Sequence, residues 1–363
     1  MMAATTLAIS QPLCRRGFAA GPGDVAVVGG APGGDGGATA TAPAATGWAS
    51  EAGVSDTAIL SAGACLKRTR SRVMLVGSTR PASSEVLVIH ADRELARRIE
   101  ALAADAQRTF AQTARRLFPD LGAEWIEIGS AVATVLEPDS PVNGTFGLGM
   151  SESLTEGDAD RLAIFFLERG LRPAASVSPF ADPSVVRVLT ARGWSVGALE
   201  NVLAREVQRA DRFAEAPRGI RIRLAETPAE RDLWATLVAQ GFAAPDAPLP
   251  AELRVGRAAV EAPSGYFLLA YADGEPAGTG ELHTDGGVGW LSADTTLPRF
   301  RRRGVQGALQ QARLAIARDD GCDIAIAESM PGSASQRNME RLGFRVVYTR
   351  AELLAPVSPK ERT

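Results

Sequence analysis

The chain has 363 residues, of which 45% are hydrophobic and 22% charged, and a formal net charge of −3. A chain of this length usually forms two domains of roughly 100–200 residues each. The small net charge argues against a protein that binds nucleic acid or an anionic membrane by bulk attraction. No apolar run approaches the ~20 residues of a membrane-spanning helix, so we expect neither nucleic-acid nor membrane partners.

Cysteine and histidine usage argues against metal and disulfide chemistry. Cys14, Cys65 and Cys322 are scattered and show neither metal-ligand spacing nor a disulfide framework. The only histidines are His90 and His283, which argues against a multi-histidine metal site. We therefore predict a cytoplasmic protein without a metal, because free cysteines are typical of a reducing compartment.

The N-terminal segment, residues 1–84, differs in composition from the rest of the chain. It is rich in glycine and alanine and contains few acidic residues, so we interpret it as a disordered low-complexity extension. A transit peptide and a true start of translation near Met74 are the alternatives. Its glycine run at 29–37 lacks the Gly-Lys-Ser/Thr ending of a phosphate loop.

From about residue 85 the chain becomes periodic. Apolar residues at helical spacing predict a helix over 89–118. Asp182 and Pro183 begin a later helix, which Gly193 ends. The other elements predicted in this half are a helix at 155–169 and strands at 125–128, 131–136, 145–149, 174–178 and 196–205. Residues 206–218 are polar and are predicted to be a linker.

The second half begins with a strand at 220–224. Thr227 and Glu230 then form a capping box with Pro228 at the first helical position. The helices predicted next are a short one at 251–260, one that ends at Gly321, and one that runs from a Ser333/Gln336 capping box to Gly343. The strands predicted are 266–271, 277–283, 288–296, 324–327 and 345–353.

The two halves share an order of elements. Gly170–Trp194 and Gly321–Phe344 each contain a strand, a capped helix, a glycine and an aromatic residue. This order predicts a weak internal duplication. The first half offers only Gly144–Gly149 where the second half has an arginine- and glycine-rich turn, and we interpret those glycines as a tight strand, because bare glycine motifs are weak signals.

That turn, Pro298–Gly307, lies between a predicted strand and a predicted helix. A glycine-bearing turn that begins a helix offers unpaired backbone N–H groups to an anion. Gly304 lacks a Cβ where a phosphate must approach closely, and Arg301–Arg303 can add charge-assisted contacts. The turn therefore predicts a site for a phosphate-bearing ligand, although a solvated arginine patch is the alternative.

Pro298-x-x-Arg301-x-x-Gly304, with the preceding strand and the later Gly343-Phe344, resembles the signature of the GNAT superfamily of acyl-CoA N-acyltransferases. The resemblance covers about 218–355, and residues 85–210 resemble a degenerate copy of the same fold. It implies an α/β protein of tandem GNAT-like folds, each a mixed, mostly antiparallel sheet flanked by helices. Gln306 replaces the motif's last small residue, and Gly307 comes one position late.

The resemblance also implies site residues. The backbone at Arg302, Arg303, Gly304, Val305, Gln306 and Gly307 would hold the pyrophosphate of acetyl-CoA, the co-substrate. Backbone groups at Thr295 and Thr296 would pair with the pantetheine amides like an added strand. The expected function is transfer of an acetyl group to a primary amine of a small molecule or peptide.

Catalysis requires a base for the attacking amine. Glu281, on the predicted strand 277–283, is our preferred base. The alternative is that Glu281 is an exposed strand residue without a catalytic role. His283, Asp294 and Glu328 are further candidates. At the place where the family usually has a proton-donating tyrosine this chain has Met339, and Ser335, Asn338 or Tyr348 are possible replacements.

Two other functions remain open. The absence of an evident acid favours a catalytically inactive acyl-CoA sensor, and a structural protein that mediates assembly is a weaker hypothesis. The acceptor is not encoded in any recognisable motif, because acceptor loops, here 243–262 and 284–287, vary over a constant scaffold. Domains of this family often dimerise, which makes a homodimer a candidate assembly.

Overall fold

The computed structural model describes residues 89–138, 140, 142–242, 250–263 and 265–357. The extension predicted at 1–84 and residues 243–249 of a predicted acceptor loop lie outside the described residues.

The first half forms the helices and strands that its sequence predicts, and one short 3-10 helix that was not predicted. They are α2 (Arg93–Leu117), η1 (Pro119–Leu121), β1 (Glu124–Ile128), β2 (Ala131–Val135), β3 (Gly144–Phe146), α3 (Glu156–Leu167), β4 (Ala174–Val177), α4 (Ser184–Ala191) and β5 (Ser195–Glu206). Strand β3 is shorter than predicted, because Gly147 and Gly149 adopt left-handed backbone angles, with φ of +80° and +74°, that end the strand.

The second half follows the predicted order as well. Its elements are β6 (Ile220–Leu224), α5 (Pro228–Phe242), α6 (Pro250–Ala259), β7 (Gly265–Ala272), β8 (Glu275–Asp285), β9 (Val288–Thr296), η2 (Pro298–Phe300), α7 (Val305–Asp319), β10 (Ile324–Ser329), α8 (Ala334–Arg341) and β11 (Arg345–Leu354).

Side-chain caps set several of these boundaries. The Glu230 amide donates to Thr227 Oγ1 (3.2 Å) and the Thr227 amide donates to Glu230 Oε2 (3.0 Å), which is a complete capping box. Ser333 caps α8 by accepting from the Gln336 amide at 3.1 Å. The Gln336 side chain reaches the Gly332 amide instead of that of Ser333, so the second predicted box closes one residue earlier.

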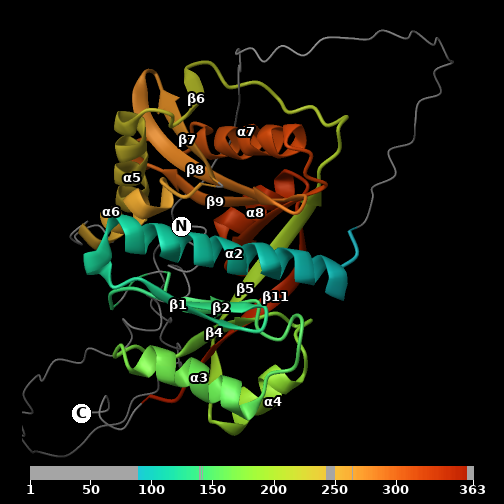
Figure 1. The fold of residues 1–363 in the computed structure, drawn as a ribbon. Coiled ribbons are helices and arrows are strands. Elements are labelled where there is room, and N and C mark those ends of the chain that lie inside the picture. Colours follow the sequence, from blue (N-terminus) through green and yellow to red (C-terminus); the bar gives the residue numbers. More distant parts are fainter. Residues whose placement is uncertain (1–88, 139, 141, 243–249, 264, 358–363) are drawn as a thin grey trace, which may run out of the picture.

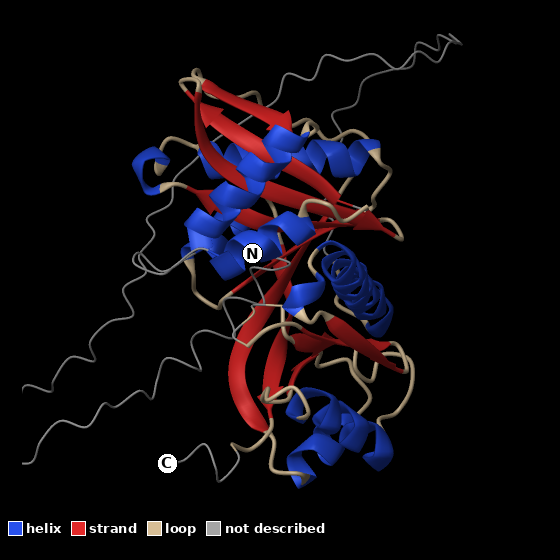
Figure 2. Ribbon diagram, turned by 60° about the vertical axis from the view of Figure 1, so that its left-hand side comes forward, coloured by secondary structure: helices blue, strands red, loops and turns tan. Residues whose placement is uncertain are grey.

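Most strands belong to one sheet, in the order β4-β11-β5-β10-β9-β8-β7-β6, while β1, β2 and β3 form a separate three-stranded sheet. The large sheet is mixed and mostly antiparallel, because only β9 and β10 pair in parallel. Helices flank it on both faces (Figures 1 and 2). The predicted fold class is confirmed.

The two halves exchange strands, which the sequence does not reveal. Strand β11 pairs with β4 and β5, and β5 pairs with β10 and β11. Each half therefore contributes its last strand to the sheet of the other half. The order β4-β11-β5-β10 has an approximate two-fold relation between the halves, and Glu200 of β5 lies directly opposite Arg350 of β11. Figure 1 shows β5 and β11 running from the upper part of the molecule to the lower part.

Helix α2 lies across the middle of the molecule, between the second half and the small sheet (Figure 1). Near its start, Arg98 forms an ion pair with Asp323 and donates to the Gly286 carbonyl at 3.2 Å. Beyond its end, Arg254 of α6 contacts Asp120 at 3.0 Å and Glu137 at 2.7 Å. These contacts fix both ends of α2 against the second half.

A buried charge cluster joins α2 to the exchanged strands. The Arg350 Nε atom donates to Glu100 Oε1 at 2.8 Å, and Arg350 also pairs with Glu328 of β10. Glu200 lies 3.9 Å from the same guanidinium, and Tyr348 donates its hydroxyl to Glu100 at 2.8 Å. One guanidinium thus faces three buried carboxylates from three elements.

Such a charge balance must favour protonation of one acid. Burial, and the neighbouring charge of Glu328, raise the pKa of Glu200 well above its ordinary value. Burial opposes the charge of Arg350, but Glu100 and Glu328 raise its pKa, so it stays charged. Glu200 is therefore the acid of this cluster whose protonated form the surroundings favour.

This assignment predicts a pH dependence of stability. A raised folded-state pKa means that stability is complete below the ordinary pKa of 4.5 and is lost as the pH rises through the folded value. Glu200→Gln cannot ionise in either state. We expect its free energy of unfolding in urea to exceed that of the parent by an amount that grows as the pH rises above the ordinary pKa of 4.5.

Glu206→Gln, on the same strand, is the control. Parallel pH profiles for the parent and Glu200→Gln would contradict a raised pKa of Glu200 in the folded state.

Candidate functional site

Strands β9 and β10 are neighbours at one end only. Their parallel pairing covers Ile324–Ile326 and Val288–Trp290. Strand β9 continues to Thr296 and β10 to Ser329, but over these described residues the two strands do not pair with each other. Beyond Trp290, β10 therefore supplies no ladder partners to the facing edge of β9, and the Thr296 carbonyl accepts from Arg301 Nε at 3.4 Å.

A β-bulge in β9 coincides with this separation. Glu281 of β8 pairs with Ser292, and Thr279 pairs with Thr295, so Gly280 lies opposite two residues, Ala293 and Asp294. Ala293 has a φ of +52°, which is unusual for a residue with a side chain and costs about 1–3 kcal/mol. Bulges bend a strand and redirect its side chains, so this one turns β9 away from β10.

The turn after β9 begins α7. Arg302 has a φ of +60° and Gly304, the N-cap, has a φ of +88°, with no side-chain cap. The first intrahelical hydrogen bond runs from the Ala308 amide to the Gly304 carbonyl at 3.3 Å. The amides of Val305–Gly307 therefore lie in the first turn, where a helix has no acceptor of its own, and this is a suitable geometry for an anion.

The arginines of this turn differ in their surroundings. Arg303 pairs with Asp273 of the β7–β8 turn, and Arg299 contacts Glu275 at 3.3 Å. Arg302 is exposed. Part of the positive charge that the sequence suggests is thus balanced by the neighbouring turn.

A groove of about 60 Å³ runs between α7 and α8 beside this turn. Gln306 and Gly307 line it from α7, and Asn338 and Arg341 line it from α8. Asn338 donates its side-chain amide to Gln306 Oε1 at 2.9 Å. Gln306, the departure from the family motif, thus bridges the two helices.

Thr295 and Thr296 lie on β9 just after the bulge. Thr295 is 4% exposed, and its hydroxyl accepts from the Thr279 amide at 3.1 Å. A Cβ at Gly278 would lie 2.2 Å from the Thr295 carbonyl oxygen, and one at Gly241 would lie 2.6 Å from the Thr295 Cβ. Gly241 and Gly278, which the sequence did not single out, therefore allow α5 and β8 to approach this end of β9 closely.

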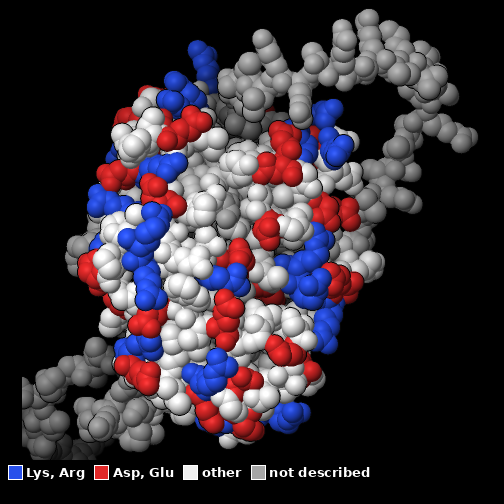
Figure 3. All heavy atoms as spheres, viewed as in Figure 1, with Lys and Arg blue, Asp and Glu red and all other residues white. Residues whose placement is uncertain are grey.

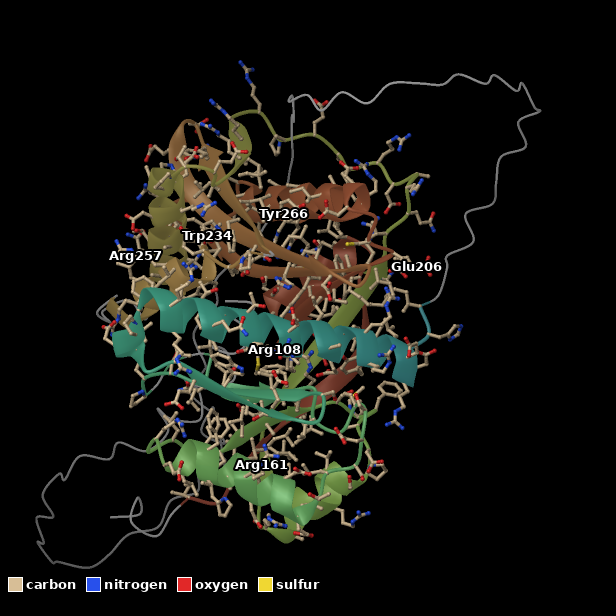
Figure 4. The ribbon with its side chains drawn as sticks, viewed as in Figure 1. Arg108, Arg161, Glu206, Trp234, Arg257 and Tyr266 are labelled. Atoms are coloured by element: carbon tan, nitrogen blue, oxygen red, sulfur yellow. The ribbon has the colours of Figure 1, made fainter. Side chains whose placement is uncertain are left out.

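Glu281 lies on the face of the sheet opposite α7. It is 7% exposed and accepts a hydrogen bond from Ser292 Oγ at 3.0 Å. It pairs across strands with Phe267, whose ring packs edge-on against Trp234 of α5 at 5.0 Å. Figure 4 shows Trp234 where α5 packs on the sheet. His283, two residues along, shares the face of Glu281 and lies opposite Trp290.

The other acid–base candidates are engaged elsewhere. Asp294 pairs with Arg313 and Glu328 pairs with Arg350. Tyr348 donates to Glu100, and burial raises the pKa of its hydroxyl well above the ordinary value. These contacts make all three poor proton carriers.

The residues considered on α8 fare similarly. Met339 is fully buried, and Asn338 is bonded to Gln306. The Ser335 hydroxyl is buried without a partner in the described structure. Of the α8 residues considered as proton donors, it is the one that is not engaged elsewhere.

In the first half, the start of α3 corresponds to the start of α7, but it is capped and the loop before it is covered by α4. Thr155 and Asp158 form a complete capping box at the start of α3. A Cβ at Gly149 would lie 2.4 Å from the Val185 side chain, so α4 packs directly on the loop before α3. Among the described helices, we therefore take the first turn of α7 as the candidate anion site.

The described residues show no group of three or more histidine, cysteine or acidic side chains arranged to hold a metal. No described helix is both long and apolar enough to cross a bilayer. The face in Figure 3 carries intermixed acidic and basic side chains rather than a patch of one sign.

Solved structures include similar proteins. A GCN5-related N-acetyltransferase from Kribbella flavida is 19% identical, with a TM-score of 0.50 over 72% of this chain and 96% of that chain. A tandem GNAT protein from the clavulanic acid biosynthesis pathway is 14% identical, with a TM-score of 0.49 over 74% and 98%. An aminoglycoside N-acetyltransferase in complex with CoA is 26% identical, with a TM-score of 0.30 over 36% and 91%.

No curated protein sequence matches the chain. Residues 231–344, however, match the profile of the acetyltransferase (GNAT) family. This match begins within α5 and ends directly before β11, and it therefore covers the bulged strand, the turn and α7. The chain thus carries a GNAT-family acetyltransferase domain at residues 231–344, in a fold that a GCN5-related N-acetyltransferase shares.

Proposed function

We propose that the protein is an N-acetyltransferase that transfers the acetyl group of acetyl-CoA to a primary amine of a small molecule or peptide. The observation that carries this proposal is the uncapped first turn of α7, Val305–Gly307, next to the unpaired edge of β9. The family match over 231–344 supports it.

The proposed cofactor contacts follow from this geometry. The main chain from Arg302 to Gly307 binds the pyrophosphate, since amides at a helix start carry partial positive charge. Main-chain groups at Thr295 and Thr296 pair with the pantetheine arm on the edge of β9 that β10 leaves open. Acetyl-CoA supplies an activated thioester and the protein supplies positioning.

Glu281 is the proposed general base. Its carboxylate takes the proton of the attacking amine as the new N–C bond forms, and the C–S bond then breaks to release the CoA thiolate. A main-chain N–H of β9 stabilises the oxyanion. The released thiolate takes a proton from solvent, because the described tyrosine nearest this role, Tyr348, is held by Glu100.

We assign transfer to the unit at 218–355 and a supporting role to 85–210. Helix α5 packs on the face that holds Glu281, and helix α2 of the first half lies against the second half (Figure 1). Together with α6 and the turn at 284–287, α2 would shape the acceptor site. A cytoplasmic location and a homodimer are parts of this proposal.

An inactive acyl-CoA sensor is the second candidate, favoured by the burial of Met339 and the engagement of Tyr348. Tight CoA binding in calorimetry without CoA release over a panel of amines would select it.

The turn provides the first test. Gly304→Glu places a carboxylate and a strained φ of +88° at the anion site. We expect CoA affinity in calorimetry to fall about 100-fold or more, since both charge repulsion and lost amide geometry oppose binding. Gly304→Ala separates the strain from the charge.

Gly321→Glu, a left-handed glycine beyond the other end of α7, is the matched control. Equal CoA affinities for Gly304→Glu and the parent would refute the assignment of this turn.

The second test concerns Glu281. Glu281→Gln keeps an acceptor for Ser292 but cannot take a proton, so turnover should fall about 100-fold with unchanged CoA affinity. Glu226→Gln, the same chemical change at an exposed residue before α5, should leave both unaltered. Full activity of Glu281→Gln would assign the base elsewhere.

A further inference from the structure

Arg313 of α7 is fully buried and lies against the bulge of β9. Its Nη1 atom donates to the Glu281 carbonyl at 2.9 Å and to the Ser292 carbonyl at 2.8 Å. Its Nε atom donates to the Leu309 carbonyl at 2.9 Å. Its Nη2 atom pairs with the Asp294 carboxylate, which is 3% exposed.

The two carbonyl contacts of Arg313 replace hydrogen bonds that the bulge removes from the ladder. Two carbonyls beside a bulge lose regular ladder partners, and buried carbonyls are nearly always paired. Arg313 supplies both partners from one guanidinium. A strained conformation such as that of Ala293 persists only where its surroundings over-determine it, and Arg313 with Asp294 provides that determination.

Gly280 makes the contact possible. It is the residue opposite the bulge, and a Cβ there would lie 2.9 Å from Arg313 Cζ. The bulge, the glycine and the guanidinium therefore form one arrangement, in which each part requires the others.

The arrangement connects two parts of the proposed site. Arg313 lies two turns along α7 from the amides of Val305–Gly307, and it holds β9 next to Thr295. A helix is rigid over that length, so the position of the guanidinium relates the turn to the unpaired edge of β9.

We propose that Arg313 and Asp294 form a positioning pair that sets β9 at the distance from α7 that productive thioester binding needs. Neither is a catalytic residue, because both are engaged on the α7 side of the sheet. The inference rests on the proposed function. Misplacement of a reacting group by 1 Å can cost about 100-fold in rate, so a loosened pair should reduce turnover more than affinity.

The test uses the full chain with Arg313→Lys and Asp294→Asn. Lysine keeps the charge but cannot make the forked contacts, and asparagine keeps the volume of Asp294 without its charge. We expect kcat for acetyl transfer to fall about 100-fold, with a Kd for CoA within about threefold of the parent value, since the turn amides are intact. If the pair only stabilised the fold, the variants would have lower thermal stability, but kcat would not fall while the Kd for CoA stayed unchanged.

Amide hydrogen exchange of residues 292–296 gives a readout that needs neither CoA nor turnover. Both variants should exchange about tenfold faster than the parent there, because local opening of the bulge becomes easier. Arg192→Lys, which loosens a comparable clamp to Asp160 and the Glu156 carbonyl in the first half, should leave that exchange unchanged.

The outcomes separate the two proposals. A parent protein that binds no CoA refutes the proposed function, while the exchange data still decide on Arg313. Unchanged exchange at 292–296, or a loss of CoA affinity as large as the loss of kcat, overturns the positioning pair. Should Arg313→Lys fail to fold, Asp294→Asn carries the same test.

Discussion

The site depends on one geometric constraint: β9 and β10 pair at one end and are kept apart at the other. The pairing ends at Trp290 and Ile326, and the bulge at Ala293–Asp294 follows directly. A fully paired sheet would leave no main-chain groups for a ligand, and a fully open one would not hold β9 in place. The bulge satisfies both needs, and Arg313 supplies the hydrogen bonds that make it tolerable.

The exchanged strands extend this constraint to the whole chain. Strand β10 is held on its other side by β5, which comes from the first half. The open side of the site is therefore supported by both halves, and the first half contributes more than a degenerate copy would suggest. The cluster around Arg350 joins the same strands to α2. The buried carboxylates of this cluster repel one another less when one of them is protonated.

The sequence predicts the local structure well, because local signals carry it. The box at Thr227 and Glu230 and the strand at 288–296 lie where they were predicted. The strand exchange was not predictable, since pairing between β5 and β10 joins residues far apart in the chain and leaves no local pattern. Arg313 was not identified either, because an arginine inside a helix shows its partners only in three dimensions. Gly278 and Gly280 have the same difficulty: their role is set by what approaches them.

The central claim is that the main chain at Val305–Gly307 receives a diphosphate beside the open edge of β9. A crystal structure of the full chain with CoA tests it most directly. The account predicts pyrophosphate oxygens within hydrogen-bonding distance of these amides and the pantetheine arm along Thr295 and Thr296. CoA bound at any other surface, with the first turn of α7 in contact with solvent alone, would contradict it.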